Sequence, residues 1–499
     1  MNNSKRLIAA ILAFVPILTA ACGTQNESPA ESTSGAETTP EITTAVPEAE
    51  YKKPDVDYGG KTVTYITHNW SSNWVINSYD LNSQEENGDL INDAIVKRNR
   101  AVEEDLKIKL EILPLTEMND RSSPGNFQKY ALSGEDMYSF AILMSGVLPS
   151  LVTTEGMFLD LNTIPTLDLS HSWWNQSANA EYTIYGKQQV AVGDICFFNN
   201  GAPVVVYFSR ELVEKNKYEN PYELVSSGNW TLEKMLKMSS DAALDLNGND
   251  LVDVDDQFGL AAEESSLGYF LECGGVRLTE RDRDGNITIA VNNEKTAGIC
   301  ELFINATKNP REVILDGAVK TTLKTSFSSN FTEFFVPKMM ADELLFFTNQ
   351  LHVALNLREM QTEFGILPMP KYDEAQENYY SYGNSSFSDT LVIPATCSDP
   401  EMAGAVVEAM GYYSQKYVTP AFIDTTVMDK AVRDEESAAI VEMVLANRIY
   451  DIGFIFNWGG LRANFGSMVG DGNANFASSY ASIENRVKSE MEKTMEMLK

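Results

Sequence analysis

The chain has 499 residues, and 43% of them are hydrophobic and 10% aromatic, enough apolar side chains for large cores in two or three folding units. It carries 38 basic and 71 acidic side chains, a formal net charge of −33 at pH 7. A surface with this charge repels phosphate backbones and anionic lipid headgroups, so we expect no nucleic-acid partner.

The N-terminus has the order of an export signal. Lys5 and Arg6 precede an apolar stretch, residues 7–18, that is too short to span a membrane as a helix. The following "TAAC" resembles the lipobox of bacterial lipoproteins, which implies that Cys22 is diacylated, with palmitate, and becomes the new N-terminus. We therefore predict a signal peptide over 1–21 and a lipid anchor that holds the protein on the extracellular side of the bacterial cell membrane. The alternative is an ordinary signal peptide that leaves Cys22 as a free thiol.

Residues 22–54 follow as a stretch rich in Ser, Thr, Glu, Pro, Ala and Gly, with almost no large apolar side chain. Such a composition cannot bury a core, so we expect a disordered tether.

Beyond the tether, strand and helix patterns alternate. Strand patterns over 61–68 and 107–113 flank a segment with helical apolar spacing, 89–106, and the strand pattern returns at 137–146. This order predicts an opening lobe with a mainly parallel sheet covered by helices. Ligands in such sheets bind beyond the carboxyl ends of the strands, so the segments that follow the first and third strands are candidate sites.

An acidic loop interrupts the middle of the chain. The segment "DLNGNDLVDVDDQFGL", residues 245–260, has a side-chain oxygen at nearly every second position. Positions 1, 3, 5, 9 and 12 of an EF-hand-type loop would be filled, with the Leu251 carbonyl at position 7, by Asp245, Asn247, Asn249, Asp253 and Asp256. Asp250 stands where the tight turn normally has Gly. We expect a structural Ca²⁺ ion here, and the alternative is a solvated turn between a helix and a strand.

Catalytic motifs and zinc-binding frames are not recognisable in the sequence. No nucleophile elbow, Walker loop, triad or HExxH frame occurs, and the cysteines after Cys22 form no CxxC pair. We expect a protein that is not an enzyme, with buried free thiols at Cys196, Cys273, Cys300 and Cys397.

Three segments in this order carry a family resemblance. They are "PVVVYFSRELVEKNKYENPYEL", "GNWTLEKMLKMSSDAALDLNGNDLVDVDDQFGL" and "FGILPMPKYDEAQENYYSYGNSSFSDTLVIPA". From about residue 55 to the C-terminus, the chain resembles the extracellular solute-binding proteins (family 1) of bacterial ABC importers, the family that takes up sugars and oligosaccharides, in their lipid-anchored form.

The resemblance implies an α/β fold of the two-lobed, periplasmic-binding-protein-like type (type II), with a hinge and an interlobe cleft. Transferring the topology gives an N-terminal lobe of 55–203 plus 366–425 and a C-terminal lobe of 204–365 plus 426–499. It further implies a monomer that captures a carbohydrate in the cleft and delivers it to the permease subunits of an ABC transporter.

Sugar sites combine aromatic platforms with polar side chains, because sugars present apolar C–H faces and many hydroxyls. Trp70 follows the first strand, and Trp458 lies in the Gly-flanked segment "FNWGGLR", so we expect the two rings to oppose each other across the cleft. Asp389 is expected to fix hydroxyls, and Ser145 and Asn349 are further ligand-binding candidates at strand ends. Each of these polar groups would serve equally well in a cap or a turn.

Two other functions stay open at this point. A surface glycoside hydrolase needs two carboxylates across a sugar cleft, and this acidic chain has enough to supply them by chance. A receptor that reports ligand occupancy to a membrane sensor would share every feature described above.

Overall fold

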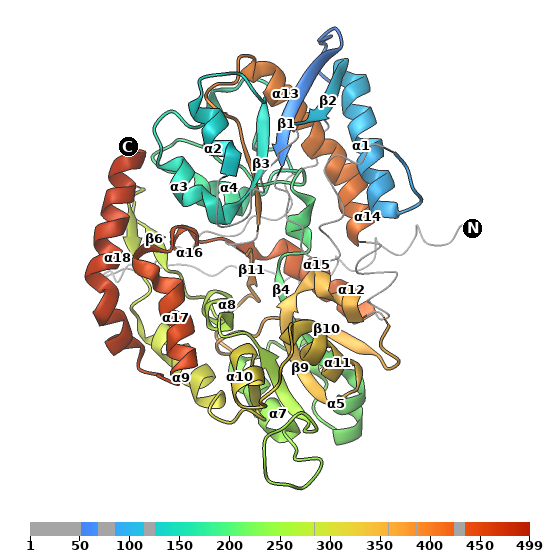
Figure 1. Cartoon of the computed structure of the whole chain (residues 1–499), viewed down its shortest axis with the longest axis vertical. Coiled ribbons are helices and arrows are strands. Elements are labelled where there is room, and N and C mark those ends of the chain that lie inside the picture. Colours follow the sequence, from blue (N-terminus) through green and yellow to red (C-terminus); the bar gives the residue numbers. More distant parts are fainter. Residues whose placement is uncertain are drawn as a thin grey trace, which may run out of the picture. The chain divides into compact units, whose positions relative to one another are not determined.

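The computed structural model describes residues 51–67, 85–113, 125–283, 285–357, 359–384, 388–423 and 435–499. Residues 48–499 form one compact unit. It contains two main sheets, which lie in the upper and lower parts of Figure 1, each with its own helices.

The first sheet has four strands in the order β12-β3-β1-β2. β1 pairs in parallel with both β2 and β3, whereas β12 runs antiparallel along the other edge of β3. The sheet is therefore mainly parallel, with one antiparallel edge strand. Its strands are β1 (Lys61–Thr67), β2 (Ile108–Ile112), β3 (Phe140–Met144) and β12 (Asp389–Val392).

The second sheet has five strands in the order β10-β4-β9-β5-β8. β5 is parallel to both of its neighbours, and β4 is antiparallel to both of its own. Every residue of β4 and β5 is buried, as expected for central strands covered on both faces. The strands are β4 (Val204–Ser209), β5 (Phe258–Ala262), β8 (Val313–Leu315), β9 (Leu344–Gln350) and β10 (Phe364–Pro368).

Two short pairs complete the strands of the described residues. One is an antiparallel hairpin of β6 (Thr279–Arg281) and β7 (Ile287–Ile289), and the other is a parallel pair of β11 (Ser381–Tyr382) and β13 (Arg448–Ile449).

Helices follow most strands and often begin at a side-chain cap. The Asp89 carboxylate, for example, accepts hydrogen bonds from the backbone N–H groups of Ile91 and Asn92 at the start of α1. The first eight helices are α1 (Leu90–Leu106), α2 (Gly125–Leu132), α3 (Leu148–Val152), α4 (Gln176–Tyr182), α5 (Arg210–Asn216), α6 (Pro221–Ser226), α7 (Leu232–Ala242) and α8 (Ser266–Cys273). The later ones are α9 (Glu294–Ala306), α10 (Asp316–Thr321), α11 (Val336–Met340), α12 (Ala354–Leu357), α13 (Pro400–Tyr413), α14 (Thr419–Ile423), α15 (Glu435–Ala446), α16 (Ile452–Phe456), α17 (Leu461–Gly470) and α18 (Phe476–Leu498).

The side-chain alternation of the first sheet separates two cores. Tyr65 and Phe140 point into a cluster that also contains residues of α1 and α13, and their neighbours Ile66 and Ala141 point into a second cluster that extends through the second sheet. Both faces of this sheet are thus covered, which explains why β3 is apolar at every position.

The chain passes back from the second sheet to the first sheet between β10 and β12. β10 pairs with β4 in the second sheet over its whole length, including Ile366 to Pro368, and β12 belongs to the first sheet. The lobe boundaries predicted from the sequence remain a prediction.

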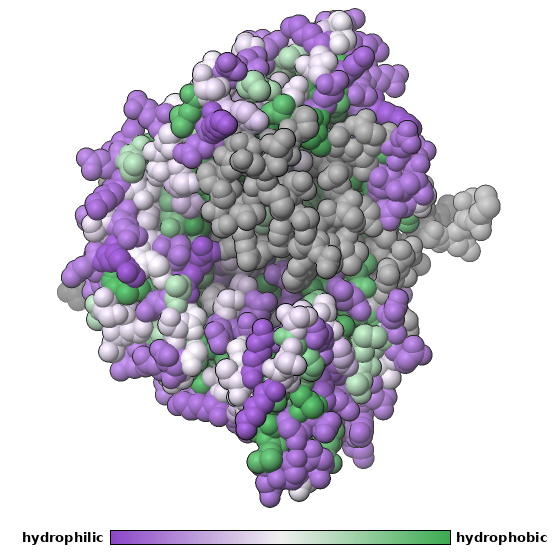
Figure 2. All heavy atoms as spheres, in the orientation of Figure 1, coloured by the Kyte–Doolittle hydropathy of each residue, from purple (hydrophilic) through white to green (hydrophobic). Residues whose placement is uncertain are grey.

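The surface agrees with the composition. Figure 2 shows a mostly hydrophilic face, with some apolar residues at the end where the loop after α7 lies. The exposed leucines of that loop are Leu244, Leu246 and Leu251. Among the helices of the described ranges, none combines the length and apolar character needed to cross a bilayer. The four cysteines at 196, 273, 300 and 397 are free and buried, as predicted.

Candidate functional site

A cavity of about 880 Å³ is lined by residues that follow strands of both main sheets and by residues of the segments that connect the two sheets. From the side of the first sheet it is lined by Gly146, which follows β3, and by Phe198 and Ala202, which precede β4. Its size is in the range of pockets that bind small molecules.

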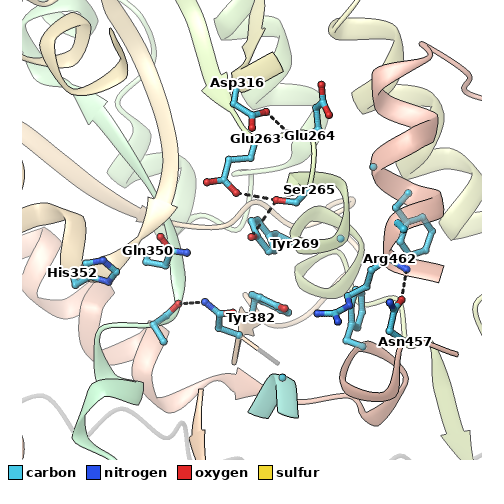
Figure 3. Close-up of a pocket in the computed structure, with 18 of the residues that line it drawn as sticks. Glu263, Glu264, Ser265, Tyr269, Asp316, Gln350, His352, Tyr382, Asn457 and Arg462 are labelled. Atoms are coloured by element: carbon cyan, nitrogen blue, oxygen red, sulfur yellow. Dashed lines mark hydrogen bonds between the residues drawn. The ribbon is translucent and has the colours of Figure 1, made fainter. Parts of the chain in front are cut away.

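The wall on the side of the second sheet is acidic. Glu263 and Glu264 directly follow β5, and Asp316 directly follows β8. Because β5 and β8 are parallel neighbours, their carboxyl ends meet at one edge of the sheet and bring the three carboxylates together. Figure 3 shows these side chains above Tyr269.

Hydrogen bonds order this acidic wall. The Glu264 backbone N–H donates to Asp316 Oδ1 at 2.9 Å, and the Ser265 hydroxyl donates to Glu263 Oε2 at 2.9 Å (Figure 3). Burial, and after it the neighbouring Asp316, raise the pKa of Glu264. Gly317 makes room for this carboxylate, since a Cβ there would overlap Glu264 Oε1.

Aromatic side chains form part of the cavity floor. The ring centroids of Tyr269, from α8, and Tyr382, from β11, are 4.8 Å apart with an interplanar angle of 37°. Phe454 of α16 lies edge-on to Tyr382, at 6.1 Å. All three residues line the cavity, but only the Tyr269 ring is partly exposed, so it offers the surface on which an apolar ligand face can stack, whereas the buried Tyr382 and Phe454 rings support it from behind.

Neutral polar groups come from the connections between the sheets. Gln350, at the end of β9, has a buried Oε1 atom that finds no hydrogen-bond partner among the described residues. Asn384 donates from Nδ2 to the Ala202 carbonyl at 3.2 Å. Burial lowers the pKa of His352 to about 4, so this imidazole is neutral at pH 7. All three residues line the cavity.

The cavity's guanidinium comes from the C-terminal segment. Asn457 ends α16 in a left-handed conformation (φ 49°), and its Oδ1 accepts a hydrogen bond from the Arg462 backbone N–H at 2.8 Å. Gly459 and Gly460 also have positive φ, which allows the tight turn into α17. This turn places both Asn457 and Arg462 on the cavity lining.

The structure packs Trp458, expected to be a sugar platform, into the protein. Its side chain is 4% exposed, its ring stacks on Phe456 with centroids 5.1 Å apart, and its Nε1 donates to Thr494 Oγ1 at 2.9 Å. The flanking glycines serve the turn, and the ring is covered by α18 instead of facing the cavity. Trp70 lies outside the described residues.

The other three predicted ligand-binding residues are buried and take part in hydrogen bonds with backbone groups. The Ser145 N–H donates to the Ser388 carbonyl at 2.8 Å, Asp389 exchanges two backbone hydrogen bonds with the Asn199 side chain, and Asn349 Oδ1 accepts from the Gln350 N–H. None of the three is among the cavity-lining residues, although the residues that follow Ser145 and Asn349 are.

Sequence reasoning missed the acidic wall and the tyrosines. The signal was available, because Glu263, Glu264 and Asp316 follow strand patterns at their carboxyl ends. The convergence of Tyr269 and Tyr382 depends on tertiary packing alone.

The acidic loop, residues 245–256, forms a turn that is contacted by Arg311. Asp250 adopts φ 60°, the conformation expected at the position that usually has Gly. The Arg311 guanidinium donates to the Leu251 carbonyl at 2.6 Å and to Asp256 Oδ2 at 2.8 Å. It also forms an ion pair with Asp245 Oδ2 at 3.8 Å, so it contacts three of the six predicted calcium ligands. No group of three or more His, Cys, Asp or Glu side chains suited to a metal ion occurs in the described part of the chain.

A second group of carboxyls consists of the buried Glu272 and Asp451 and the half-buried Glu181. Glu272 of α8 is fully buried, and neither of its carboxyl oxygens has a hydrogen-bond partner among the described residues. Asp451 caps α16 by accepting from the Gly453 N–H at 2.7 Å, and it also accepts from the Leu278 N–H at 2.6 Å. Glu181 of α4 accepts from the Ile452 N–H at 3.1 Å. Burial, and after it Asp451, raise the pKa of Glu272 well above its ordinary value.

Comparisons with known proteins identify the fold. No protein-family model and no curated protein sequence matches the chain. Solved structures do: the ABC substrate-binding protein Lmo0181 from Listeria monocytogenes, in complex with cycloalternan, has a TM-score of 0.52 at 11% identity over 86% of this chain and 99% of that one. The apo form of RafE from Streptococcus pneumoniae has a TM-score of 0.51 at 11% identity, over 90% and 100%. The chain therefore has the two-lobed α/β fold of solute-binding proteins, as predicted.

Proposed function

We propose that this protein is a binding protein that captures a sugar or oligosaccharide in the cavity and delivers it to an ABC permease. The observation that carries the proposal is a cavity of about 880 Å³ in a solute-binding fold, lined by two tyrosines and by polar groups from both sheets' segments. A structural neighbour, Lmo0181, was solved with the carbohydrate cycloalternan.

The chemistry of the lining supports a carbohydrate. The partly exposed Tyr269 provides ring surface for the C–H faces of a sugar, and the buried Tyr382 ring packs against it. Gln350, Asn457 and Arg462 add amide and guanidinium groups that exchange hydrogen bonds with hydroxyls.

A thermal-shift screen of the purified chain against mono- and oligosaccharides tests this function. A ligand that binds only the folded state raises the melting temperature, by an amount equivalent to about 2.7 kcal/mol at a hundredfold excess over Kd. For each sugar that raises the melting temperature, calorimetry and product analysis then distinguish binding from cleavage. Steady release of cleaved sugar would favour a hydrolase that uses the carboxylates of the acidic wall, and no response to any sugar would refute the proposal.

We further propose that Cys22 carries the lipid anchor and that residues 22–54 tether the lobes to the extracellular side of the membrane. The order of charged residues, apolar stretch and "TAAC" supports this. Replacement of Cys22 by Ser is expected to move the protein from the membrane fraction to the soluble fraction, and unchanged retention would contradict the anchor.

For the acidic loop we propose a structural calcium ion. Asp256 Oδ1 is a buried acceptor without a partner among the described residues, which suits a cation. The Leu251 carbonyl and Asp256 Oδ2 would have to exchange Arg311 for the ion, so the arginine and calcium would compete.

A further inference from the structure

The net charge of the cavity lining indicates which class of sugar the cavity can bind. Three carboxylates, Glu263, Glu264 and Asp316, line the cavity, and Arg462 is the cation among the lining residues that the structure describes. His352 contributes no charge at neutral pH, because burial lowers its pKa to about 4. The described lining therefore carries an excess of two negative charges.

This excess is concentrated on one wall. Glu263, Glu264 and Asp316 belong to the carboxyl ends of β5 and β8, whereas Arg462 comes from α17. The influences that shift the pKa of Glu264 are burial and Asp316, and both raise it. A cation bound near this wall would relieve that repulsion, whereas a bound anion would increase it.

The wall is also rich in hydrogen-bond acceptors. Ionised carboxylates only accept hydrogen bonds, and Glu263, Glu264 and Asp316 all line this side of the cavity. A protonated amine brings three donors and no acceptor, so it complements such a wall better than a hydroxyl does.

An aromatic face lies beside the acceptors. Tyr269 lines the same cavity, and its hydroxyl is 3.4 Å from the Ser265 Oγ atom, which itself donates to Glu263 (Figure 3). An aromatic ring face attracts cations as well as C–H groups. The wall thus combines two features that recognise an ammonium group.

We propose that the carbohydrate bound in this cavity carries protonated amines, that is, an amino sugar or a short oligosaccharide of amino sugars. This inference rests on the proposed function, and it adds the charge of the ligand. The same wall disfavours anionic sugars, such as uronic acids and sugar phosphates.

Calorimetry on the purified chain tests the inference with matched sugars. Glucosamine and its short oligomers are compared with the N-acetylated, neutral counterparts and with galacturonic acid oligomers, at about pH 6, where the sugar amine is protonated. The amine series is expected to bind at least about tenfold more tightly than the neutral series, and the anionic series is expected not to bind.

Three variants make the test specific. Glu263→Gln and Glu264→Gln are each expected to weaken binding of the amine series about three- to tenfold, clearly more than they weaken binding of neutral sugars. Glu301→Gln, on the exposed face of α9, makes the same change in net charge away from the cavity and is expected to change nothing.

The outcomes are distinguishable. Equal or tighter binding of the neutral series overturns the amine inference and leaves the carbohydrate function in place. A loss of amine binding in Glu301→Gln as large as that in the wall variants also overturns it, since the effect would then come from net charge alone. No binding of any sugar in the three series, together with no response in the wider screen, overturns both proposals.

Discussion

The cavity lining and the side chains packed beside it contain the same residue types but differ in their contacts. In the lining, Tyr269 and Glu264 face a space that a ligand can fill. Beside it, Trp458 packs on Phe456, and Glu272 is fully buried. The difference shows that an aromatic or acidic side chain serves binding or stability according to the element that covers it. Each of the following predictions tests that division, in order of decreasing expected effect.

Trp458→Ala is expected to lower the free energy of unfolding by about 3–5 kcal/mol, because it removes a large buried ring and leaves a cavity. The loss of the hydrogen bond from Nε1 to Thr494 is part of this cost. Urea denaturation measures the change, and Trp458→Phe, which keeps a ring on Phe456, should cost much less. If Trp458→Ala were as stable as the parent but had lost sugar binding, Trp458 would belong to the site after all.

Tyr269→Ala is expected to weaken binding of the sugar found in the screen about ten- to a hundredfold, or ~1–3 kcal/mol, because stacking surface is lost. Its ring is only partly buried, so thermal unfolding should change little. Calorimetry checks the affinity, with Tyr269→Phe as the control that keeps the ring. Unchanged affinity in Tyr269→Ala would move the stacking surface to another part of the cavity.

Glu272→Gln is expected to stabilise the protein at neutral and higher pH, by ~1–3 kcal/mol, because a buried carboxylate without partners is replaced by a neutral group. The native pKa of Glu272 is raised above that of the unfolded chain. The native state therefore holds the proton more tightly, and the parent loses stability as the pH rises above the unfolded pKa towards the native one.

Melting temperatures at acidic and alkaline pH check this prediction. The advantage of Glu272→Gln should be smallest near the ordinary pKa of a glutamate and should grow as the pH rises. The exposed Glu301→Gln variant should show no such trend. A variant that is less stable than the parent at alkaline pH would mean that the ionised Glu272 is paired in solution.

Calcium is expected to raise the melting temperature by an amount equivalent to roughly 1 kcal/mol, the smallest effect of the four, because Arg311 already contacts three of the proposed ligands. Arg311→Gln should enlarge the response, and Asp245→Ala should abolish it. A chelator and calcium that leave the melting temperature of both the parent and Arg311→Gln unchanged would show that the loop is only a turn.

The fold could be predicted from the sequence more completely than the residues of the candidate site. The order and spacing of three long segments led to the two-lobed fold, because those segments form β4, β5, β10 and β12 with the helices between them. The positive φ of Asp250 also followed from its place in the loop. Such features depend on local sequence.

The cavity was harder to predict because its lining converges from distant segments. Trp458 was chosen for its glycine neighbours, but these glycines make the turn that leaves the ring against α18. Nothing local distinguishes Trp458 from Tyr269. Which of them is covered depends on helices that lie tens or hundreds of residues away in the chain.

The edge strand β12 has a consequence for the order of folding. The hydrogen bond from Thr390 Oγ1 to the Leu143 carbonyl joins residues 247 positions apart. A chain that is still being synthesised therefore carries β3 with an unpaired edge until the whole second sheet has followed it, and such an edge readily pairs with other chains. Long-range pairing of this kind also slows folding. The first lobe is thus completed only after the sequence of the second sheet is in place, so any delay in that sheet prolongs the exposure of the β3 edge.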